Sequence, residues 1–148
     1  MGIRHQGREL ALQALYRMDI CGGATNEDLA IFFDNFTADP SARRFAIKLI
    51  DGVAAEIPAL DKLLSETLEH WSIRRLSRVD HNILRLALFE LLRMEEIPAR
   101  VTFDEAIELA KAYGDQDSGR FVNGVLDEIA RRLNLKNKGE AADAPKVE

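Results

Sequence analysis

The sequence predicts an all-α fold, a compact bundle of about seven helices. Apolar residues recur three and four positions apart along most of the chain, as Ala11, Ala14 and Leu15 do near the amino end. Sustained period-two alternation is absent, and no turn signal joins two β-branched runs as in a hairpin. Glycine and proline divide the chain into stretches of about 10–17 residues, a typical helix length. These observations predict helices near residues 8–20, 26–36, 41–56, 58–69, 77–95, 102–113 and 118–133.

Three helix boundaries have a local cause in the sequence. Ser77 followed by Asp80, and Thr102 followed by Glu105, have the form of a capping box. In that motif the hydroxyl accepts a hydrogen bond from a free backbone amide, and the acid reaches back to the first residue. Gly114 suits the left-handed residue that often ends a helix. The sequence therefore predicts helix starts at the first two places and a helix end at the third.

The composition is that of one ordinary globular domain. The chain has 148 residues, of which 47% are hydrophobic and 30% are charged. Residues 1–133 are predicted to form this domain, and the polar residues 134–148, which lack periodicity, a flexible tail. The start is too polar for a signal peptide and no apolar run is long enough to span a membrane, so we expect a cytoplasmic location. The net charge of −5 argues against a broad nucleic-acid-binding surface but allows local basic patches.

No motif for catalysis is found. The sequence lacks a phosphate-binding loop, a nucleophile elbow and the helical HExxH zinc motif. His5, His70 and His81 are not spaced as metal ligands, either with one another or with Cys21. Cys21, the only cysteine, is expected to be a small buried hydrophobic residue. We therefore expect no catalytic residue, no metal and no cofactor, which leaves a binding protein.

Positive charge gathers in two places. In the first, residues 4–8, Arg4 and Arg8 are four apart and lie on one side of a helix, which suits phosphate contacts or belongs simply to a solvated end. The second surrounds the start of the helix near 77–95 and consists of Arg74, Arg75, Arg78 and Arg85. Because a helix start disfavours positive charge, these arginines need an internal ion pair, from Asp80 or another nearby acid, or else a bound anion.

The segment from Gly114 to Gly124 is the other unusual stretch. Asp117 and Ser118 are candidate N-caps of the last helix. Arg120 and Phe121 then fall in its first turn, where free backbone amides together with Arg120 form a small anion site. The ring of Phe121 either stacks on an unpaired base or begins the stripe that faces the core.

Four strings of the sequence resemble the NusB family of bacterial transcription antitermination factors. They are RELALQALY at 8–16, ILRLALFEL at 83–91, DEAIELAK at 104–111 and FVNGVLD at 121–127. The resemblance runs from about Arg4 to Leu133 and implies an all-helical fold in two helical subdomains, without enzyme activity. It also implies two partners: NusE, which is a small-subunit ribosomal protein, and the single-stranded boxA RNA of ribosomal RNA operon leaders. Bound to both, such a protein helps RNA polymerase to resist termination.

Carried over by position, the resemblance implies an RNA-binding surface. Its residues are Arg4, His5, Gln6, Arg8, Gln13, Tyr16, Asp117, Ser118, Arg120 and Phe121. Tyr16 would also border the NusE surface, and Asp80 matches an acidic position on the NusE side. With only two arginines in the amino arm, we expect tight RNA binding to depend on NusE.

Two alternatives stay open at this point. NusB-like domains also dock substrates at the front of ribosomal RNA cytosine methyltransferases, although this chain, which ends at Glu148, has no room for a methyl-donor domain. Family members also self-associate through the surface that they use for partners, so a purely structural helical dimer is the other alternative.

Overall fold

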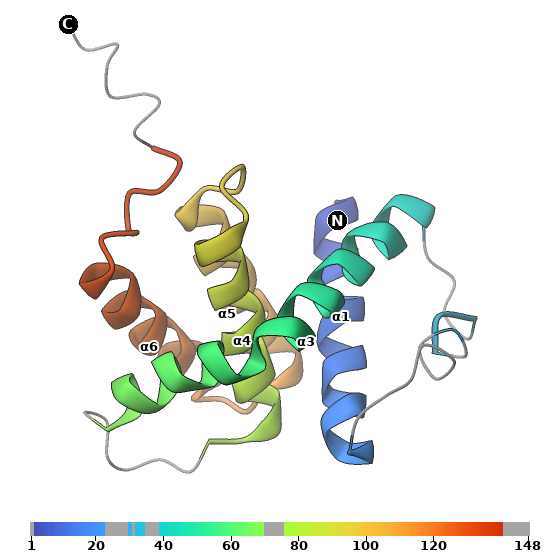
Figure 1. Ribbon diagram of the computed structural model, residues 1–148, viewed down its shortest axis with the longest axis horizontal. Helices are drawn as coiled ribbons and strands as arrows, with labels where there is room; N and C mark the ends of the chain where they lie inside the picture. The colour runs from blue at the N-terminus through green and yellow to red at the C-terminus, as the bar shows by residue number, and fades with distance from the viewer. Residues whose placement is uncertain (1, 23–29, 31, 35–38, 70–75, 141–148) are drawn as a thin grey trace, which may run out of the picture. The chain divides into compact units, whose positions relative to one another are not determined.

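The computed structural model describes residues 2–22, 30, 32–34, 39–69 and 76–140. Within these ranges it defines the bounds of five helices: α1 (Ile3–Cys21), α3 (Pro40–Leu68), α4 (Arg78–Arg93), α5 (Ala99–Tyr113) and α6 (Ser118–Arg132) (Figure 1). Residues 30 and 32–34 are also helical, and the rest of the helix predicted near 26–36 lies outside the described residues. The described part of the chain contains no strand, so the all-α prediction is confirmed.

The chain divides into two compact units, residues 1–55 and residues 56–148. Helix α3 belongs to both, and its path is interrupted at Glu56, whose φ of −124° and ψ of 17° are not helical. Pro58 follows two residues later. Its ring and its missing amide hydrogen disfavour an unbroken helix at this point. The helices predicted at 41–56 and 58–69 are therefore the two halves of α3. Two units agree in number with the two helical subdomains that the resemblance implies.

In the first unit, α1 begins earlier than expected. The apolar spacing predicts a start near residue 8, preceded by a flexible arm, but the helix starts at Ile3 and the arm is its first turns. Its buried side includes Leu12 and Leu15. Cys21 is the last residue of the helix and is exposed, so its predicted burial is wrong. The buried side of α1 ends at Leu15, six residues before this position.

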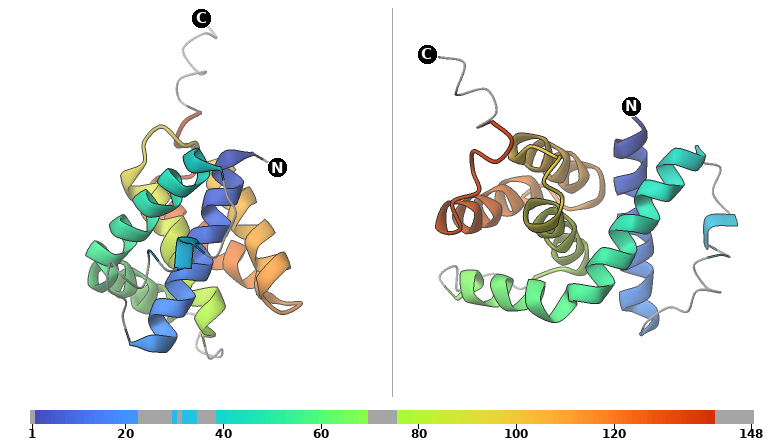
Figure 2. Two further views of the ribbon diagram at one scale, coloured as in Figure 1. Left: turned by 90° about the vertical axis from the view of Figure 1, so that its right-hand side faces the viewer. Right: turned by 45° about the horizontal axis from the view of Figure 1, so that its top comes forward.

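In the second unit, α4 lies at the centre of the packing. Residues 82–91 are all buried, and α4, α5 and α6 pack against one another in every pairing (Figure 2). This run includes two ionisable side chains, those of Arg85 and Glu90, which are 6% and 2% exposed. Buried charges are costly unless they are paired, so the contacts of these two residues constrain the unit.

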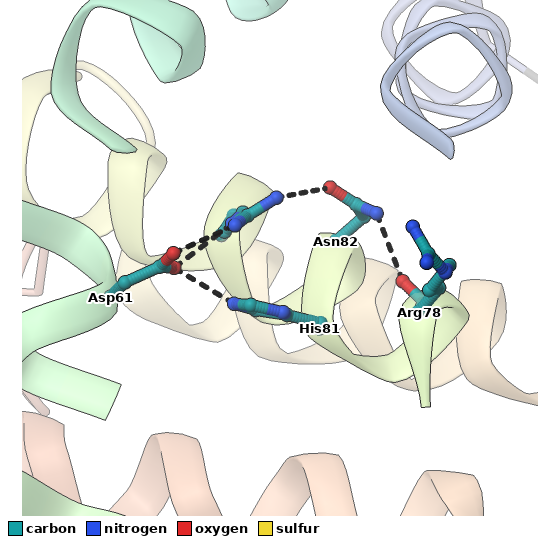
Figure 3. Close-up of polar contacts among 5 residues, drawn as sticks. Asp61, Arg78, His81 and Asn82 are labelled. Carbon is teal, nitrogen blue, oxygen red and sulfur yellow. Dashed lines mark hydrogen bonds and ion pairs between the residues drawn. The ribbon is translucent and has the colours of Figure 1, made fainter. Parts of the chain in front are cut away.

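Asp61, on the second half of α3, pairs with Arg85 through both carboxylate oxygens. Arg85 donates from Nε to Asp61 Oδ1 at 2.9 Å and from Nη2 to Oδ2 at 2.7 Å (Figure 3). Its Nη1 donates to Asn82 Oδ1 at 3.1 Å, and His81 Nε2 is hydrogen-bonded to Asp61 Oδ1 at 2.8 Å. Partial burial raises the pKa of Asp61, but the hydrogen bonds from Arg85 and His81 outweigh it and hold the pKa below its ordinary value of 3.8.

This network decides between the internal ion pair and the bound anion that the sequence left open for Arg85. Arg85 is neutralised by an internal ion pair, as one alternative held, but the acid is Asp61 rather than Asp80. Arg74 and Arg75 lie outside the described residues.

The two predicted capping boxes have different outcomes. Ser77 is the N-cap of α4, and its hydroxyl accepts a hydrogen bond from the Asp80 amide at 3.1 Å, as predicted. Thr102 is not a cap, because α5 already begins at Ala99. The Thr102 hydroxyl is buried and donates instead to Glu90 Oε1 at 2.9 Å, which satisfies the buried carboxylate of α4.

The segment after α6 is more ordered than the sequence predicts. A flexible tail was expected over residues 134–148, but residues 134–140 form turns that fold back onto α4 and α5. The Ala99 amide donates to the Lys138 carbonyl at 2.9 Å, and Lys138 Nζ donates to the Glu90 carbonyl at 2.7 Å. Burial lowers the pKa of Lys138 below its ordinary value of 10.5. The prediction is therefore wrong for residues 134–140, because these polar groups supply partners that the helix ends lack.

Replacing Asp61 by Asn should destabilise the protein by about 1–3 kcal/mol at neutral pH, because the buried Arg85 loses its countercharge. The folded-state pKa of Asp61 is lowered, so its contribution is complete above the unfolded value of 3.8 and is lost as the pH falls through the folded value. Denaturant unfolding from neutral pH downwards should show the two proteins converging below about pH 4. Glu56→Gln, which removes the exposed pair with Arg93, is the control and should have little effect. An equal loss in both variants would contradict the structural role of Asp61.

Candidate nucleic-acid interface

The amino-terminal part of the predicted RNA surface lies on the first turns of α1. Arg4 and Arg8 are one turn apart, and the guanidinium carbon of each lies 5.4 Å from the centroid of the Phe45 ring on α3. Contacts of this kind are worth about 0.5–1 kcal/mol at exposed sites. Arg4 is exposed whereas Arg8 is buried, so Arg4 presents the charge to solvent. Two guanidinium groups thus lie beside the single ring of Phe45.

A glycine makes this arrangement possible. A Cβ atom at Gly7 would lie 2.7 Å from Phe45 Cδ2 and 3.0 Å from the Ala42 carbonyl oxygen. A side chain at this position would therefore require α1 or the Phe45 ring to shift. The glycine between the two arginines sets the distance at which they meet that ring.

The other predicted residues of α1 differ in exposure. His5 is half-buried, and its Nε2 lies 3.7 Å from Glu9 Oε2. Gln6 is exposed and Gln13 is half-buried. Tyr16 is 40% exposed, so its ring is available to a partner, as predicted.

The carboxyl-terminal part of the predicted surface is the turn between α5 and α6, and Asp115 organises it. Asp115 Oδ1 accepts a hydrogen bond from the Asp117 amide at 2.9 Å and one from the Ser118 hydroxyl at 3.3 Å. The Ser118 hydroxyl in turn accepts from the Asp115 amide at 3.0 Å. Asp117 is the N-cap by position but makes no side-chain capping hydrogen bond. Ser118 is buried and holds the turn together, whereas Asp117 is exposed.

Gly114, which ends α5, is required for a different reason from the predicted one. Gly114 is extended, with φ −95° and ψ −166°, so the left-handed cap is wrong. A Cβ atom at Gly114 would clash with the Ser118 hydroxyl oxygen. Close approach within the turn, rather than backbone conformation, therefore requires the glycine.

Phe121 does not present its ring as a stacking surface. It is 6% exposed and lies on the buried side of α6 with Val122 and Val125, so the expected exposed ring is wrong. The alternative, that Phe121 begins the core stripe, accounts for its burial. Arg120, its neighbour, is exposed as predicted.

A groove of about 520 Å³ lies between the end of α5 and the start of α6. It is lined by Ile107, Lys111, Gly114, Asp115, Gln116, Gly119, Arg120 and Asn123. Of these residues, only Arg120 belongs to the RNA-binding surface predicted from the sequence. Lys111 of α5 therefore lines the same groove as Arg120.

Asp80, which the resemblance places on the NusE side, is completely buried. A side chain without exposed surface cannot contact a partner directly in this conformation. Its placement is that of a residue inside the first turn of α4, where negative charge is favoured.

Sequence reasoning missed Phe45, Asp115 and Lys111. Phe45 lies on another helix from the arginines that it contacts, so no local pattern could have paired them. Asp115 is followed two residues later by a turn amide, a spacing typical of Asx turns, and this signal could have been found.

Other site classes find no support in the described part of the chain. No three His, Cys, Asp or Glu side chains there gather as a metal would require. None of the helices searched in that part is long and apolar enough to cross a membrane.

Comparison with known proteins identifies the family. The sequence model of the NusB family matches residues 5–131. The chain belongs to the NusB family. The transcription antitermination protein NusB of Citrifermentans bemidjiense is 46% identical to it over 144 residues, which cover 92% of this chain and 99% of that protein. The family resemblance predicted from the sequence is thereby confirmed.

Solved NusB structures share the fold. T. maritima NusB is 42% identical, with a TM-score of 0.75, and the match covers 86% of this chain and 90% of that one. A crystal structure of the antitermination factors NusB and NusE in complex with dsRNA matches with 31% identity and a TM-score of 0.76, over 88% of this chain and 97% of that one. This NusB-family chain is thus similar along most of its length to proteins named for transcription antitermination.

Replacing Gly7 by Ala should lower the melting temperature by a few degrees. Overpacking against Phe45 costs about 1–3 kcal/mol, which exceeds the gain of about 1 kcal/mol that alanine brings to a helix. Gly119→Ala is the control, since its Cβ would meet atoms no closer than 3.8 Å and the variant adds a helical alanine without overpacking. Calorimetry of both variants checks this, and a stabilised Gly7→Ala would refute the tight contact.

Proposed function

We propose that this chain is a non-catalytic adaptor in transcription antitermination, which binds single-stranded boxA RNA of ribosomal RNA operon leaders together with NusE. Its place of action would be the cytoplasm, in the antitermination complex of RNA polymerase. Membership of the NusB family carries the proposal. The exposed charge of Arg4, held beside Arg8 on the Phe45 ring, supports an RNA contact at α1.

On the RNA side, we assign contact roles to the exposed members of the predicted surface. Arg4 and Arg120 would contact phosphates, and Tyr16 would offer a ring to one unpaired base, a contact worth about 1–3 kcal/mol. The buried members act from inside: Arg8 shares the Phe45 ring, Ser118 holds its turn, and Phe121 anchors α6.

On the protein side, Tyr16 and Ile20 support a docking surface for NusE. They lie one turn apart on α1 and are 40% and 55% exposed, so together they form an apolar strip. The same strip would serve the free protein in a homodimer. Asp80 would act indirectly, by fixing the first turn of α4.

Tight RNA binding should require NusE. The chain carries a net charge of −5, and the amino arm brings only two arginines against the repulsion between the protein and a phosphate backbone. Titration of a boxA oligonucleotide with and without NusE, at two salt concentrations, should give at least a tenfold difference in affinity. Nanomolar binding by this chain alone would contradict the dependence, and no binding with NusE present would refute the proposed function.

Replacing Phe45 by Leu should weaken binding of boxA RNA with NusE roughly threefold to tenfold, because both arginines lose the ring that orders them. Phe45→Tyr keeps an aromatic face and should bind as the wild type does. A melting curve for each variant separates a loss of order at the arginines from unfolding. Equal affinities for the folded Leu variant and the wild type would show that Phe45 does not position them.

A further inference from the structure

We propose that Arg44 and Lys48, on the first half of α3, form a phosphate-binding track for the RNA strand that adjoins boxA, whatever the sequence of that strand. The inference rests on the proposed function, since it gives a second contact region to the same RNA. It goes beyond the predicted RNA surface, which includes no residue of α3. The chemical group that the track recognises is the phosphate of a single-stranded backbone.

The first half of α3 lies against the first turns of α1 (Figure 1). The guanidinium carbons of Arg4 and Arg8 each lie 5.4 Å from the centroid of the Phe45 ring, and Gly7 between them approaches the same side chain. Both segments belong to the first unit, residues 1–55. An RNA strand held at Arg4 therefore has the start of α3 as its neighbouring surface.

Arg44 and Lys48 are one turn apart and lie on the same side of Phe45. At about 100° per residue, Lys48 stands about 60° and Arg44 about 100° around the helix axis from Phe45, in the same direction. Both are exposed. The buried residues of this half stand in the opposite direction; they are Ala42, Ala46, Leu49, Ile50 and Val53. The two cations thus border, on the solvent side, the ring that Arg4 contacts.

The charge of this half of α3 departs from that of the whole chain. Residues 40–55 contain three cations, Arg43, Arg44 and Lys48, against one acid, Asp51, whereas the chain has a net charge of −5. Arg43 is half-buried, and its Nη2 donates to the Phe33 carbonyl at 3.0 Å, which gives it a structural role. Structure does not account for the other two cations in the same way.

The described part of the chain does not neutralise these cations. Arg44 Nη2 donates to the uncharged Ser41 hydroxyl at 3.0 Å, and no ion pair joins Arg44 or Lys48 to a described residue. The acid just before α3, Asp39, is engaged elsewhere, because its Oδ1 accepts a hydrogen bond from the Ser41 amide at 2.7 Å. Two exposed positive charges therefore remain for a polyanion, and they extend the charge that Arg4 presents.

The track offers no surface on which a base could stack. Phe45 is the only aromatic residue of α3, and it is half-buried with two guanidinium groups beside its ring. Stacking needs an exposed ring, whereas contacts between cations and phosphates carry no sequence information. The track should therefore hold the nucleotides next to boxA without selecting among bases.

The test measures the gain in affinity that flanking nucleotides bring, using the full chain with NusE. Three RNAs are compared: boxA alone, and boxA with roughly ten uridines added at its 5′ end or at its 3′ end. For the wild type, one of the two extensions should strengthen binding by roughly threefold or more. An extension of a different sequence at that end should bring the same gain, because phosphates are contacted rather than bases.

The variants assign this gain to the track. In the double variant Arg44→Ala and Lys48→Ala the extended RNA should bind no better than boxA alone. The slope of log affinity against log salt for the extended RNA should become shallower by about 0.7 in Lys48→Ala and by about 1.4 in the double variant. Lys62→Ala is the matched control, since Lys62 is an exposed lysine of the other half of α3, and it should keep the full gain.

The outcomes separate the inference from the proposed function. If the wild type with NusE does not bind boxA alone, the proposed function fails and the inference fails with it. If it binds but neither extension helps, or if the double variant keeps the gain, the function stands and the inference is overturned. A gain that depends on the sequence of the extension would also overturn it. If a melting curve shows the double variant to be unfolded, Lys48→Ala decides against Lys62→Ala, and equal gains in both overturn the inference.

Discussion

The pairing of Asp61 with Arg85 is the interaction on which the second unit depends. Helix α4 is buried over residues 82–91, and a guanidinium in that run is tolerated only with a countercharge. Asp61 supplies it from α3, through two hydrogen bonds. Arg132 Nη2 donates to the Thr67 hydroxyl at 2.7 Å, which joins the same half of α3 to α6. Polar contacts therefore join the second half of α3 to both α4 and α6.

Two glycines shape the candidate interface in opposite ways. At Gly7 the missing side chain lets the backbone of α1 approach Phe45, so Arg4 and Arg8 share one aromatic surface. At Gly119 the missing side chain leaves space beside α5 that packing would allow a residue to fill. Gly7 thus allows close packing between α1 and α3, whereas Gly119 leaves unfilled space beside α5. A glycine in a helix thus has a meaning that only its surroundings decide.

Sequence patterns predicted the features that depend on neighbouring residues. Contacts between helices determined the features that the patterns did not predict. Helix positions followed from apolar spacing, and the Ser77 cap was predicted because its partner amide is three residues away. Thr102 has the same sequence signature, but its partner Glu90 is twelve residues away on another helix. Phe121 illustrates the limit at the site: a first-turn aromatic residue has the same spacing whether it faces solvent or the core. The family resemblance predicted a surface but could not tell its buried members from its exposed ones.

The fold-back of residues 134–140 has a consequence for synthesis on the ribosome. The end of α4 and the first amide of α5 find their partners at Lys138, which is translated after every helix of the second unit. Nascent chains fold from the amino end, so the first unit can form early. The second unit lacks its last contacts until residues 134–140 have left the ribosomal exit tunnel. A frameshift a few codons before Lys138 would leave α1 and α3 to α6 intact and yet remove the partners of the Glu90 carbonyl and the Ala99 amide.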